Sequence, residues 1–285
     1  MLRIKVNATS ANVCVGFDVL GIALNLANEF SFEKAKEVSF FGFEKEYCST
    51  RSNLVYKSYE KVFSYLGEAL VPVKIGFKGE IPVSRGLGSS SSLIVAGVFA
   101  ANYFATKKLS KDELFNICCE LEGHPDNVAP AVYGGFVASY KENNNYKAIS
   151  YPISNDLKFI AIIPPFPLST NAARKALPEK LSYADITNNL SRIIHLPKAL
   201  ASGDIQLLKE LFNDKLHEPY RGKLIKGYLE IKSICEKENA AFAISGSGST
   251  MLIITKDEGI IEKIKKFNYS IKTLEVGNGV TLWEE

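Results

Sequence analysis

The first third of the chain alternates between apolar and polar positions in short runs. Residues 2–8, LRIKVNA, have the period of two that is typical of a half-buried strand. FDVLGIALN and NEFSFEKA continue with strand character as two further segments, and VPVKIGFKGEIPV returns to the period of two. SNLVYKSYEKVFSYLG instead spaces its apolar residues as a helix does, from Leu54 to Leu66, and ends on Gly67. These patterns predict several strands and one amphipathic helix.

The next segments predict two helices and a hairpin. SLIVAGVFAANYFATKKL is apolar on all sides and ends in cationic residues, which favours a buried helix with a stabilised C-terminus. SKDELFNICCELEG begins with Ser110 and has Glu113 three residues later, the pattern of a capping box. AVYGGFVASYKENNNYKAISYPI predicts two strands that are joined by its asparagine-rich turn.

The second half opens with LKFIAIIPPF, a buried strand that ends at the proline pair. Residues 169–238 are predicted to be mostly helical. AFAISGSGSTMLIIT then predicts strand, glycine turn and strand, and KDEGIIEKIKKF and SIKTLEVG predict a helix and a last strand. Strands followed by helices and a strand–helix–strand tail indicate an α+β protein of two layers. We expect a boundary between residues 150 and 160 and a shared interface between the two halves.

Composition narrows the class of protein. The chain has 285 residues, of which 46% are hydrophobic and 23% are charged, enough for two modest domains or one large one. With 34 basic and 31 acidic residues the net charge is only +3, which favours a small-molecule partner over nucleic acid or a membrane.

The cysteines and the N-terminus bear on the compartment. The five cysteines are odd in number and lack C-x-x-C spacing, and the chain has three histidines, so we expect free thiols and no zinc site. The first residues contain no long apolar segment, and no apolar run approaches the roughly 20 residues of a membrane span. We therefore expect a soluble, cytoplasmic protein.

Residues 81–93, IPVSRGLGSSSSL, are the main candidate for chemistry. A flexible linker has polar flanks, whereas this Gly/Ser run lies between a predicted strand and a strongly apolar helix. Gly86 and Gly88 allow positive φ and close approach of a ligand, and the following helix start offers free amides and a positive dipole to an anion. The run fits neither the Walker A motif nor G-x-G-x-x-G. Its local physics leaves two readings open, a phosphate-binding loop and a structural glycine turn.

Three other polar stretches accompany this loop. They are ATSANVCVGFDVLG at 8–21, EGHPDNVAPAVYGG at 122–135 and AISGSGST at 243–250. Each has an ordinary structural explanation by itself, as a turn, a helix cap or a hairpin. Their joint occurrence in this order favours a functional role.

The four stretches together resemble the motifs of the GHMP kinase superfamily. PVSRGLGSSSS is similar to its phosphate loop, and ISGSGST is similar to its third motif, with Ser249 where proline is usual. Within the superfamily, NATSANVCVGFDVLGIAL, EGHPDNVAPAVYGG and STNAARKALP resemble the homoserine kinase family. The resemblance covers nearly the whole chain. It implies a two-domain GHMP kinase fold: an ATP-binding domain like ribosomal protein S5 domain 2 at residues 1–155, and a ferredoxin-like domain at 156–285.

The resemblance also implies a reaction and a site. The reaction is ATP-dependent, Mg²⁺-assisted phosphorylation of the side-chain hydroxyl of L-homoserine to O-phospho-L-homoserine, in threonine biosynthesis from aspartate. The residues implied for ATP are Asn53, Gly86, Leu87, Gly88, Ser89, Ser90 and Ser91. Those implied for the amino-acid substrate are Asn12, Asp18, His124, Thr170, Arg174, Arg221 and Gly246.

Two further sets follow from the same resemblance. Asp126 and Asn127 match the pair beside the acceptor hydroxyl, with the role of Asp126 as a base left open. Ser90 and Glu122 match the Mg²⁺ ligands, as a hard cation prefers oxygen, and Glu120 in CCELEG is the rival carboxylate. The alternatives are another GHMP kinase, such as a mevalonate-type enzyme, or a non-catalytic sensor on the same scaffold. A homodimer is a further expectation.

Overall fold

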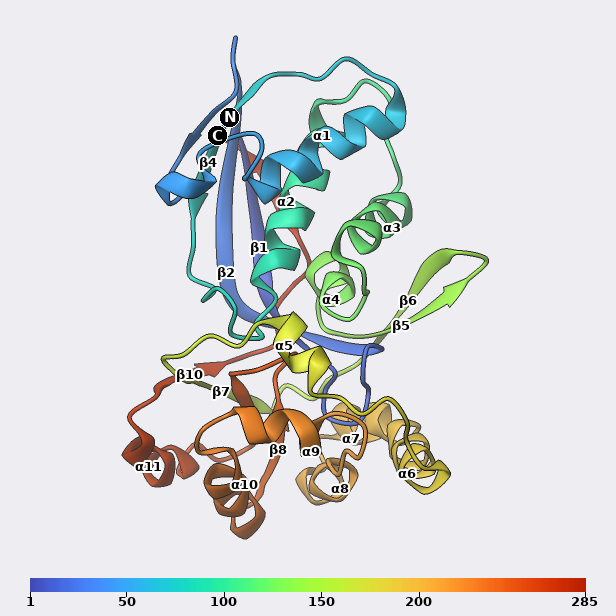
Figure 1. Cartoon of the computed structure of the whole chain (residues 1–285), viewed down its shortest axis with the longest axis vertical. Helices are drawn as coiled ribbons and strands as arrows, with labels where there is room; N and C mark the ends of the chain where they lie inside the picture. Colours follow the sequence, from blue (N-terminus) through green and yellow to red (C-terminus); the bar gives the residue numbers. More distant parts are fainter.

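Two sheets, one in each half of an elongated molecule, organise the chain in the computed structural model, which describes residues 1–285 (Figure 1). The upper sheet has seven strands, in the order β11-β1-β2-β4-β3, and β5 pairs with β2 and β6. Its strands are β1 (Leu2–Ala11), β2 (Leu20–Lys34), β3 (Ser39–Phe41), β4 (Val73–Lys78), β5 (Phe136–Glu142), β6 (Asn145–Tyr151) and β11 (Thr281–Glu284).

Four helices cover one face of the upper sheet (Figure 1). They are α1 (Leu54–Leu66), α2 (Ser89–Phe104), α3 (Lys111–Glu122) and α4 (Val128–Tyr133), with a short 3-10 turn, η1 (Lys45–Tyr47), before them. Helix α2 lies in the middle and is apolar on most of its surface, because it packs against α1, α3, α4 and strand β1. The buried position of this helix, predicted from its sequence, is confirmed.

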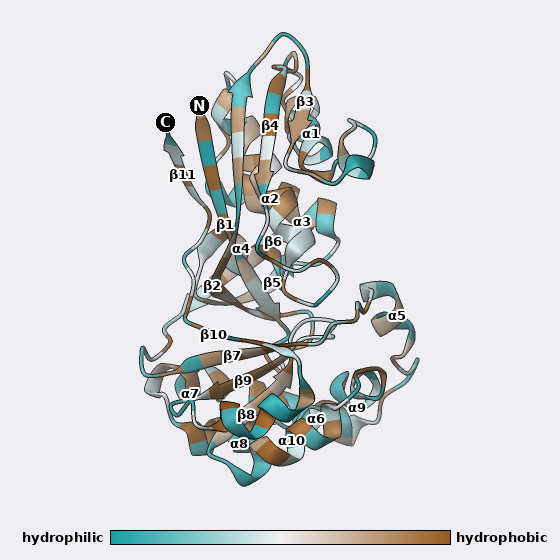
Figure 2. Cartoon of the chain, turned by 90° about the vertical axis from the view of Figure 1, so that its left-hand side faces the viewer, coloured by the Kyte–Doolittle hydropathy of each residue, from teal (hydrophilic) through white to brown (hydrophobic).

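The lower sheet has the order β10-β7-β9-β8, with every neighbouring pair antiparallel. Its strands are β7 (Lys158–Ile163), β8 (Ala240–Ile244), β9 (Met251–Thr255) and β10 (Ser270–Leu274). The first and third strands of this unit, β7 and β9, lie in the centre of the sheet. Helices also follow each of these two strands in the chain, and this is the ferredoxin-like arrangement. Figure 2 shows that β7 and β9 are largely apolar along their length.

The helices of the lower half are mostly short. They are α5 (Thr170–Lys175), α6 (Tyr183–Ile193), α7 (Leu196–Ser202), α8 (Ile205–Leu211), α9 (Glu218–Arg221), η2 (Gly222–Leu224), α10 (Tyr228–Lys237), α11 (Ile260–Ile264) and η3 (Lys265–Phe267). The halves share one hydrophobic core of 27 buried residues, in which Ile22 and Leu24 of β2 join Phe159 of β7 and Leu252 of β9. The halves are therefore joined by packed side chains.

Two features could not be read from the sequence. The strand character of FDVLGIALN and NEFSFEKA is confirmed, and the two segments join in one 15-residue strand, β2, with a register shift at Asn7/Ala8 of β1 opposite it. The tail, predicted as part of the C-terminal domain, returns to the upper sheet: Val276 bridges Leu24, and β11 pairs with β1. A four-residue edge strand with all its side chains exposed has too little apolar alternation to be read from sequence. The boundary at 155/156 itself stays a prediction.

Several local predictions are confirmed. Gly67 caps α1 in the left-handed conformation, and Ser110 and Glu113 form both bonds of a capping box at α3. The β5–β6 turn uses Asn143 and Asn144 at positive φ. Lys108 donates to three carbonyl oxygens at the end of α2, which stabilises that helix terminus. None of the helices has both the length and the apolar character that a membrane crossing requires.

Candidate active site

The Gly/Ser run forms a tight loop that leads directly into α2. Gly86 and Gly88 have φ of +74° and +68°, so both occupy the left-handed region that favours glycine. A Cβ at Gly88 would lie 1.9 Å from the hydroxyl oxygen of Thr9, and one at Gly86 would lie 2.1 Å from the carbonyl oxygen of Ser245. These glycines therefore allow the loop to pack between β1 and the loop after β8.

The start of α2 leaves backbone amides free. The amide of Ser92 is the first to bond to the turn, donating to the carbonyl of Gly88 at 3.0 Å, so the preceding amides have no intrahelical partner. The first turn contains no acidic side chain that would oppose an anion. Free amides, the positive end of the helix dipole and serine hydroxyls together make an anion-binding site.

Glu122, at the end of α3, faces this helix start. Its Oε1 accepts hydrogen bonds from the hydroxyls of Ser90 at 2.6 Å and Ser91 at 3.0 Å. The rival carboxylate, Glu120, is exposed and does not line the cavity. Of the two acids, Glu122 alone is beside the Gly/Ser loop.

The donor set at Glu122 suits Mg²⁺. One carboxylate and the Ser90 hydroxyl are hard oxygen ligands, and the structure has no cluster of three or more His, Cys, Asp or Glu side chains that could hold a metal ion by itself. Such a sparse site fits an ion that keeps waters and takes its remaining ligands from substrate phosphates. The residues therefore fit the predicted metal.

The turn after α3 holds the residues of the HPDN sequence. Asp126 is 3% exposed, and its Oδ1 lies 2.9 Å from His124 Nδ1 and accepts from the Asn127 amide at 3.0 Å. The hydrogen bond with Asp126 raises the pKa of His124 above its ordinary value, against the opposing effect of burial. The Asn127 side chain is fixed in turn, because its Oδ1 accepts from the Thr9 hydroxyl at 2.7 Å.

Two arginines from the lower half reach the same space. Arg174 of α5 donates from Nη1 and Nη2 to the two oxygens of Asp18, both at 2.9 Å, in a bidentate ion pair. Arg221 of α9 is only 2% exposed, and burial lowers its pKa. Its Nη1 donates to the carbonyl of Gly246 at 3.2 Å, which ties the arginine to the third glycine loop.

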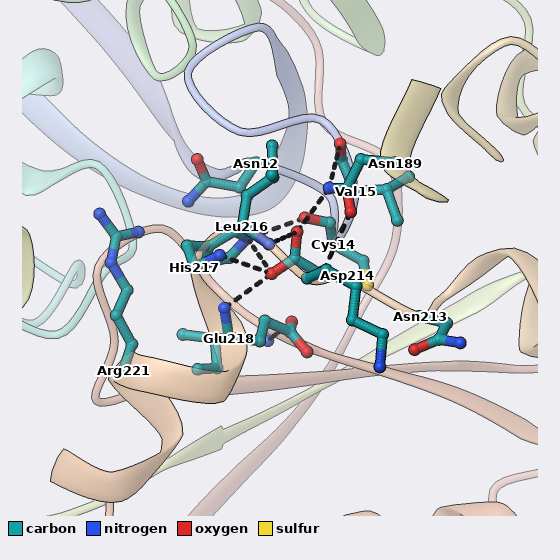
Figure 3. A network of polar contacts seen from close by, with 12 residues as sticks. Asn12, Cys14, Val15, Asn189, Asn213, Asp214, Leu216, His217, Glu218 and Arg221 are labelled. Carbon is teal, nitrogen blue, oxygen red and sulfur yellow. Dashed lines mark hydrogen bonds and ion pairs between the residues drawn. The ribbon is translucent and has the colours of Figure 1, made fainter. Parts of the chain in front are cut away.

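Asp214 fixes the turn that carries Arg221 (Figure 3). Its carboxylate accepts from the amides of His217 and Glu218, each at 2.7 Å, and from the Asn189 side chain at 2.6 Å. Asn189 also donates to the carbonyl of Val15 at 3.2 Å. This buried network joins α6 and α9 to the loop that carries Asp18.

The loop between β1 and β2 is itself bound to the third glycine loop. Asn12 has φ of +70° and donates from Nδ2 to the carbonyl of Gly246 at 2.8 Å, while its Oδ1 accepts from the amide of Asp18 at 3.0 Å. Thr170 lies nearby, with its hydroxyl 3.5 Å from that of Ser247. Three segments far apart in sequence, the β1–β2 loop, the start of α5 and the third glycine loop, therefore lie next to one another.

Asn53 also lines this cavity, as do the aromatic residues Phe43, Tyr47 and Phe77. Asn53 is 1% exposed, and both polar atoms of its side chain form hydrogen bonds within the protein. Oδ1 accepts from the Tyr56 amide at 3.0 Å, and Nδ2 donates to the carbonyl of Tyr47 at 2.9 Å. Asn53 is therefore the N-cap of α1 and also fixes the aromatic loop at the wall of the cavity.

One cavity of about 400 Å³ brings nearly all the predicted residues together. Leu87 and Ser91 are the two exceptions: both are buried behind the loop and do not line the cavity. The predicted residues that do line it are Asn12, Asp18, Asn53, Gly86, Gly88, Ser89, Ser90, Glu122, His124, Asp126, Asn127, Thr170, Arg174, Arg221 and Gly246.

Sequence reasoning missed some residues that shape this site. Arg85 lines the cavity and donates to the carbonyls of Pro164 and Pro165, so it joins the loop to the lower half. Its place inside the PVSRGLG sequence was a signal that could have been used. Asp214 gave no comparable signal, because its partners come from distant segments.

A cavity-lining helix start with free amides, a carboxylate beside it and a polar pocket between two domains indicate an ATP-dependent kinase for a small molecule. Residues 53–135 match the GHMP kinases N terminal domain, and residues 197–270 match the GHMP kinases C terminal domain. The chain belongs to the GHMP kinase family.

The most informative relatives are homoserine kinases. The chain is 39% identical over 274 residues to that of Clostridium botulinum (strain Langeland / NCTC 10281 / Type F), covering 96% of this chain and 91% of the relative. It is 42% identical over 280 residues to that of Clostridium beijerinckii, covering 96% and 93%. The crystal structure of homoserine kinase from Cytophaga hutchinsonii superposes with a TM-score of 0.87 at 27% identity, covering 99% of this chain and 97% of that one.

Proposed function

We propose that this protein transfers the γ-phosphoryl group of ATP to the side-chain hydroxyl of L-homoserine. The product is O-phospho-L-homoserine, and the reaction belongs to threonine biosynthesis from aspartate. The observation that carries this proposal is the charge pattern of the cavity. Arg174 and Arg221 supply two cations, and Asp18 and Asp126 supply two carboxylates, in the same cavity as the start of α2 with its free amides. This pattern is complementary to a zwitterionic alcohol beside a nucleotide triphosphate.

The phosphates would lie against the loop and the start of α2. We assign their binding to Gly86, Gly88, Ser89 and Ser90, which line the cavity, and we assign to the buried Leu87 and Ser91 the support of the loop and helix start. The aromatic loop at 43–47 and Asn53 would enclose the base. Ser90 and Glu122 would hold Mg²⁺, which when bound neutralises the charge of the phosphates.

The zwitterion has a direct counterpart in the Asp18–Arg174 ion pair. The substrate ammonium would bind Asp18, and the substrate carboxylate would bind Arg174 and Arg221. The ion pair between Asp18 and Arg174 would then be replaced by two contacts with the substrate, and only a zwitterion can make both. Asn12, Thr170 and Gly246 would form the remaining wall. An alcohol without both charged groups would leave one partner of the pair without compensation.

The acceptor hydroxyl would be oriented by the HPDN turn. Asp126 Oδ1 is occupied by His124 and the Asn127 amide, while Oδ2 accepts no hydrogen bond and is available to a substrate hydroxyl. Positioning and charge neutralisation supply most of the effect in a loose phosphoryl-transfer transition state, so orientation is the main role we assign to Asp126 and Asn127. A cytoplasmic location, a homodimer and the absence of nucleic-acid binding stay predictions.

A substrate panel tests the proposal. ADP release is measured with Mg²⁺ and ATP in the presence of L-homoserine, mevalonate or galactose at equal concentrations. We expect rapid release with homoserine and release near the no-acceptor control with the other two. Faster release with mevalonate would instead indicate the mevalonate-type alternative, and no release with any acceptor would favour the sensor.

A further inference from the structure

Phe17 lies behind the two cavity arginines. It belongs to the loop between β1 and β2, next to Asp18, and it is partly buried and does not line the cavity. The guanidinium carbon of Arg221 is 5.0 Å from the centre of its ring, and that of Arg174 is 5.8 Å away. Both distances are within the range of a cation–π contact, so one ring contacts both cations.

The positive charges of Arg174 and Arg221 repel each other, and a contact with an aromatic ring reduces the cost of holding them close together. Arg221 is 2% exposed and bonds to backbone carbonyls, and no carboxylate forms an ion pair with it. Burial and then the charge of Arg174 lower the pKa of Arg221. The negative face of an aromatic ring can stabilise such cations without occupying the donors that a substrate carboxylate needs.

The ring of Phe17 is itself held by His217. The two rings stack with their centroids 5.4 Å apart and an angle of 29° between their planes. Nε2 of His217 is 2.8 Å from the carbonyl oxygen of Cys14, so the proton of the imidazole lies on Nε2, which donates this bond (Figure 3). Burial lowers the pKa of His217, which disfavours a third cation beside the arginines.

We propose that Phe17 is a positioning residue that determines the selectivity of the site for carboxylate-bearing alcohols, by holding Arg174 and Arg221 side by side. The inference rests on the proposed function. It adds that the carboxylate clamp depends on an aromatic ring outside the cavity. That ring stacks on His217, whose Nε2 donates to the carbonyl of Cys14.

The test compares Phe17→Met, which keeps apolar volume and removes the ring, with Phe17→Tyr, which keeps the ring. The substrates are L-homoserine and L-2-amino-1,4-butanediol, which has the same hydroxyl and ammonium but no carboxylate. We expect Phe17→Met to raise the KM for homoserine about fivefold to thirtyfold, the loss of two cation–π contacts. The values of kcat, of the KM for ATP and of kcat/KM for the diol should stay within about twofold of wild type. Phe17→Tyr should behave as wild type.

A matched control is available at Phe267. Its ring lies in η3, away from the cavity, with the Lys266 ammonium 5.4 Å from the ring centre. Phe267→Met makes the same chemical change there and should leave the kinetic constants for both substrates unchanged.

Three results would overturn the inference: an unchanged homoserine KM, a parallel loss with both substrates, or a Tyr variant as impaired as the Met variant. If Phe17→Met does not fold, Phe17→Leu replaces it, and failure of both to fold would make Phe17 a core residue and would also overturn the inference. Lack of homoserine turnover by the wild-type protein would instead reject the proposed function.

Discussion

The assignment of the metal carboxylate can be tested with two substitutions that are chemically identical. Glu122→Gln removes one negative charge and keeps an oxygen that can accept from the hydroxyls of Ser90 and Ser91. Glu120→Gln makes the same change two residues away, on an exposed side chain outside the cavity. The pair therefore separates loss of a metal ligand from loss of a nearby charge.

The expected magnitudes follow from the two environments. Hydrogen bonds to charged groups contribute about 1.5 to 3 kcal/mol, and we take this range for the contact that the Glu122 carboxylate would make to a bound ion. At 1.4 kcal/mol per tenfold, Glu122→Gln should weaken the apparent Mg²⁺ affinity about 10-fold to 150-fold. Glu120 is exposed and its charge is screened, so Glu120→Gln should change that affinity less than about fivefold.

The assay is ADP release at fixed total ATP and saturating homoserine, as free Mg²⁺ is varied. The midpoint of each titration gives the apparent affinity for wild type and both variants. Thermal unfolding without ligands serves as the control for fold. Equal shifts in the two variants, or a larger shift in Glu120→Gln, would refute the reasoning and move the ligand to Glu120.

Two further predictions concern substrate binding and stability. Arg174→Ala should raise the KM for homoserine about 10-fold to 100-fold with little change in the KM for ATP, because a carboxylate contact is lost and Asp18 loses its partner; steady-state kinetics showing an unchanged homoserine KM would reject the clamp. Burial raises the pKa of Glu218 from 4.5 to about 7, so folding favours its protonated form. Protonated Glu218 therefore contributes to the stability of the fold. This contribution is fully present below pH 4.5 and is lost as the pH rises through about 7. Between pH 4.5 and pH 8, the free energy of unfolding of wild type, measured with urea, should fall by up to about 3 kcal/mol relative to that of Glu218→Gln. Parallel curves of unfolding free energy against pH for the two proteins would contradict this.

The sequence alone determined the features that depend on short-range geometry. The apolar run after the Gly/Ser loop could only be a buried helix, and the flanking strand and helix excluded a flexible linker. Gly86 and Gly88 could be identified because positive φ is costly for other residues. The capping box of Ser110 and Glu113 is equally local, since it joins residues three positions apart. The resemblance of four motifs, in order, then predicted the family.

Only the tertiary structure decided which side chains meet. Glu120 and Glu122 are about 200° apart around a helix, so they point to nearly opposite sides, and the packing of α3 beside α2 selects Glu122 for the cavity. The return of β11 to β1 joins opposite ends of the chain, with the N-terminal amine donating to the carbonyl of Glu285. Neither the placing of Glu122 at the cavity nor the pairing of β11 with β1 produces a local pattern in the sequence.

The proposed carboxylate clamp shows the same division most clearly. Two arginines and an aspartate could be assigned from their motifs, yet the ring of Phe17 that contacts both arginines could not. Phe17 and Arg221 come together because Asp214 orients α9 and Asn189 ties it to the β1–β2 loop, through bonds between residues far apart in the chain. Local propensity sets the backbone of each segment, whereas long-range packing and buried hydrogen bonds set which segments share a site.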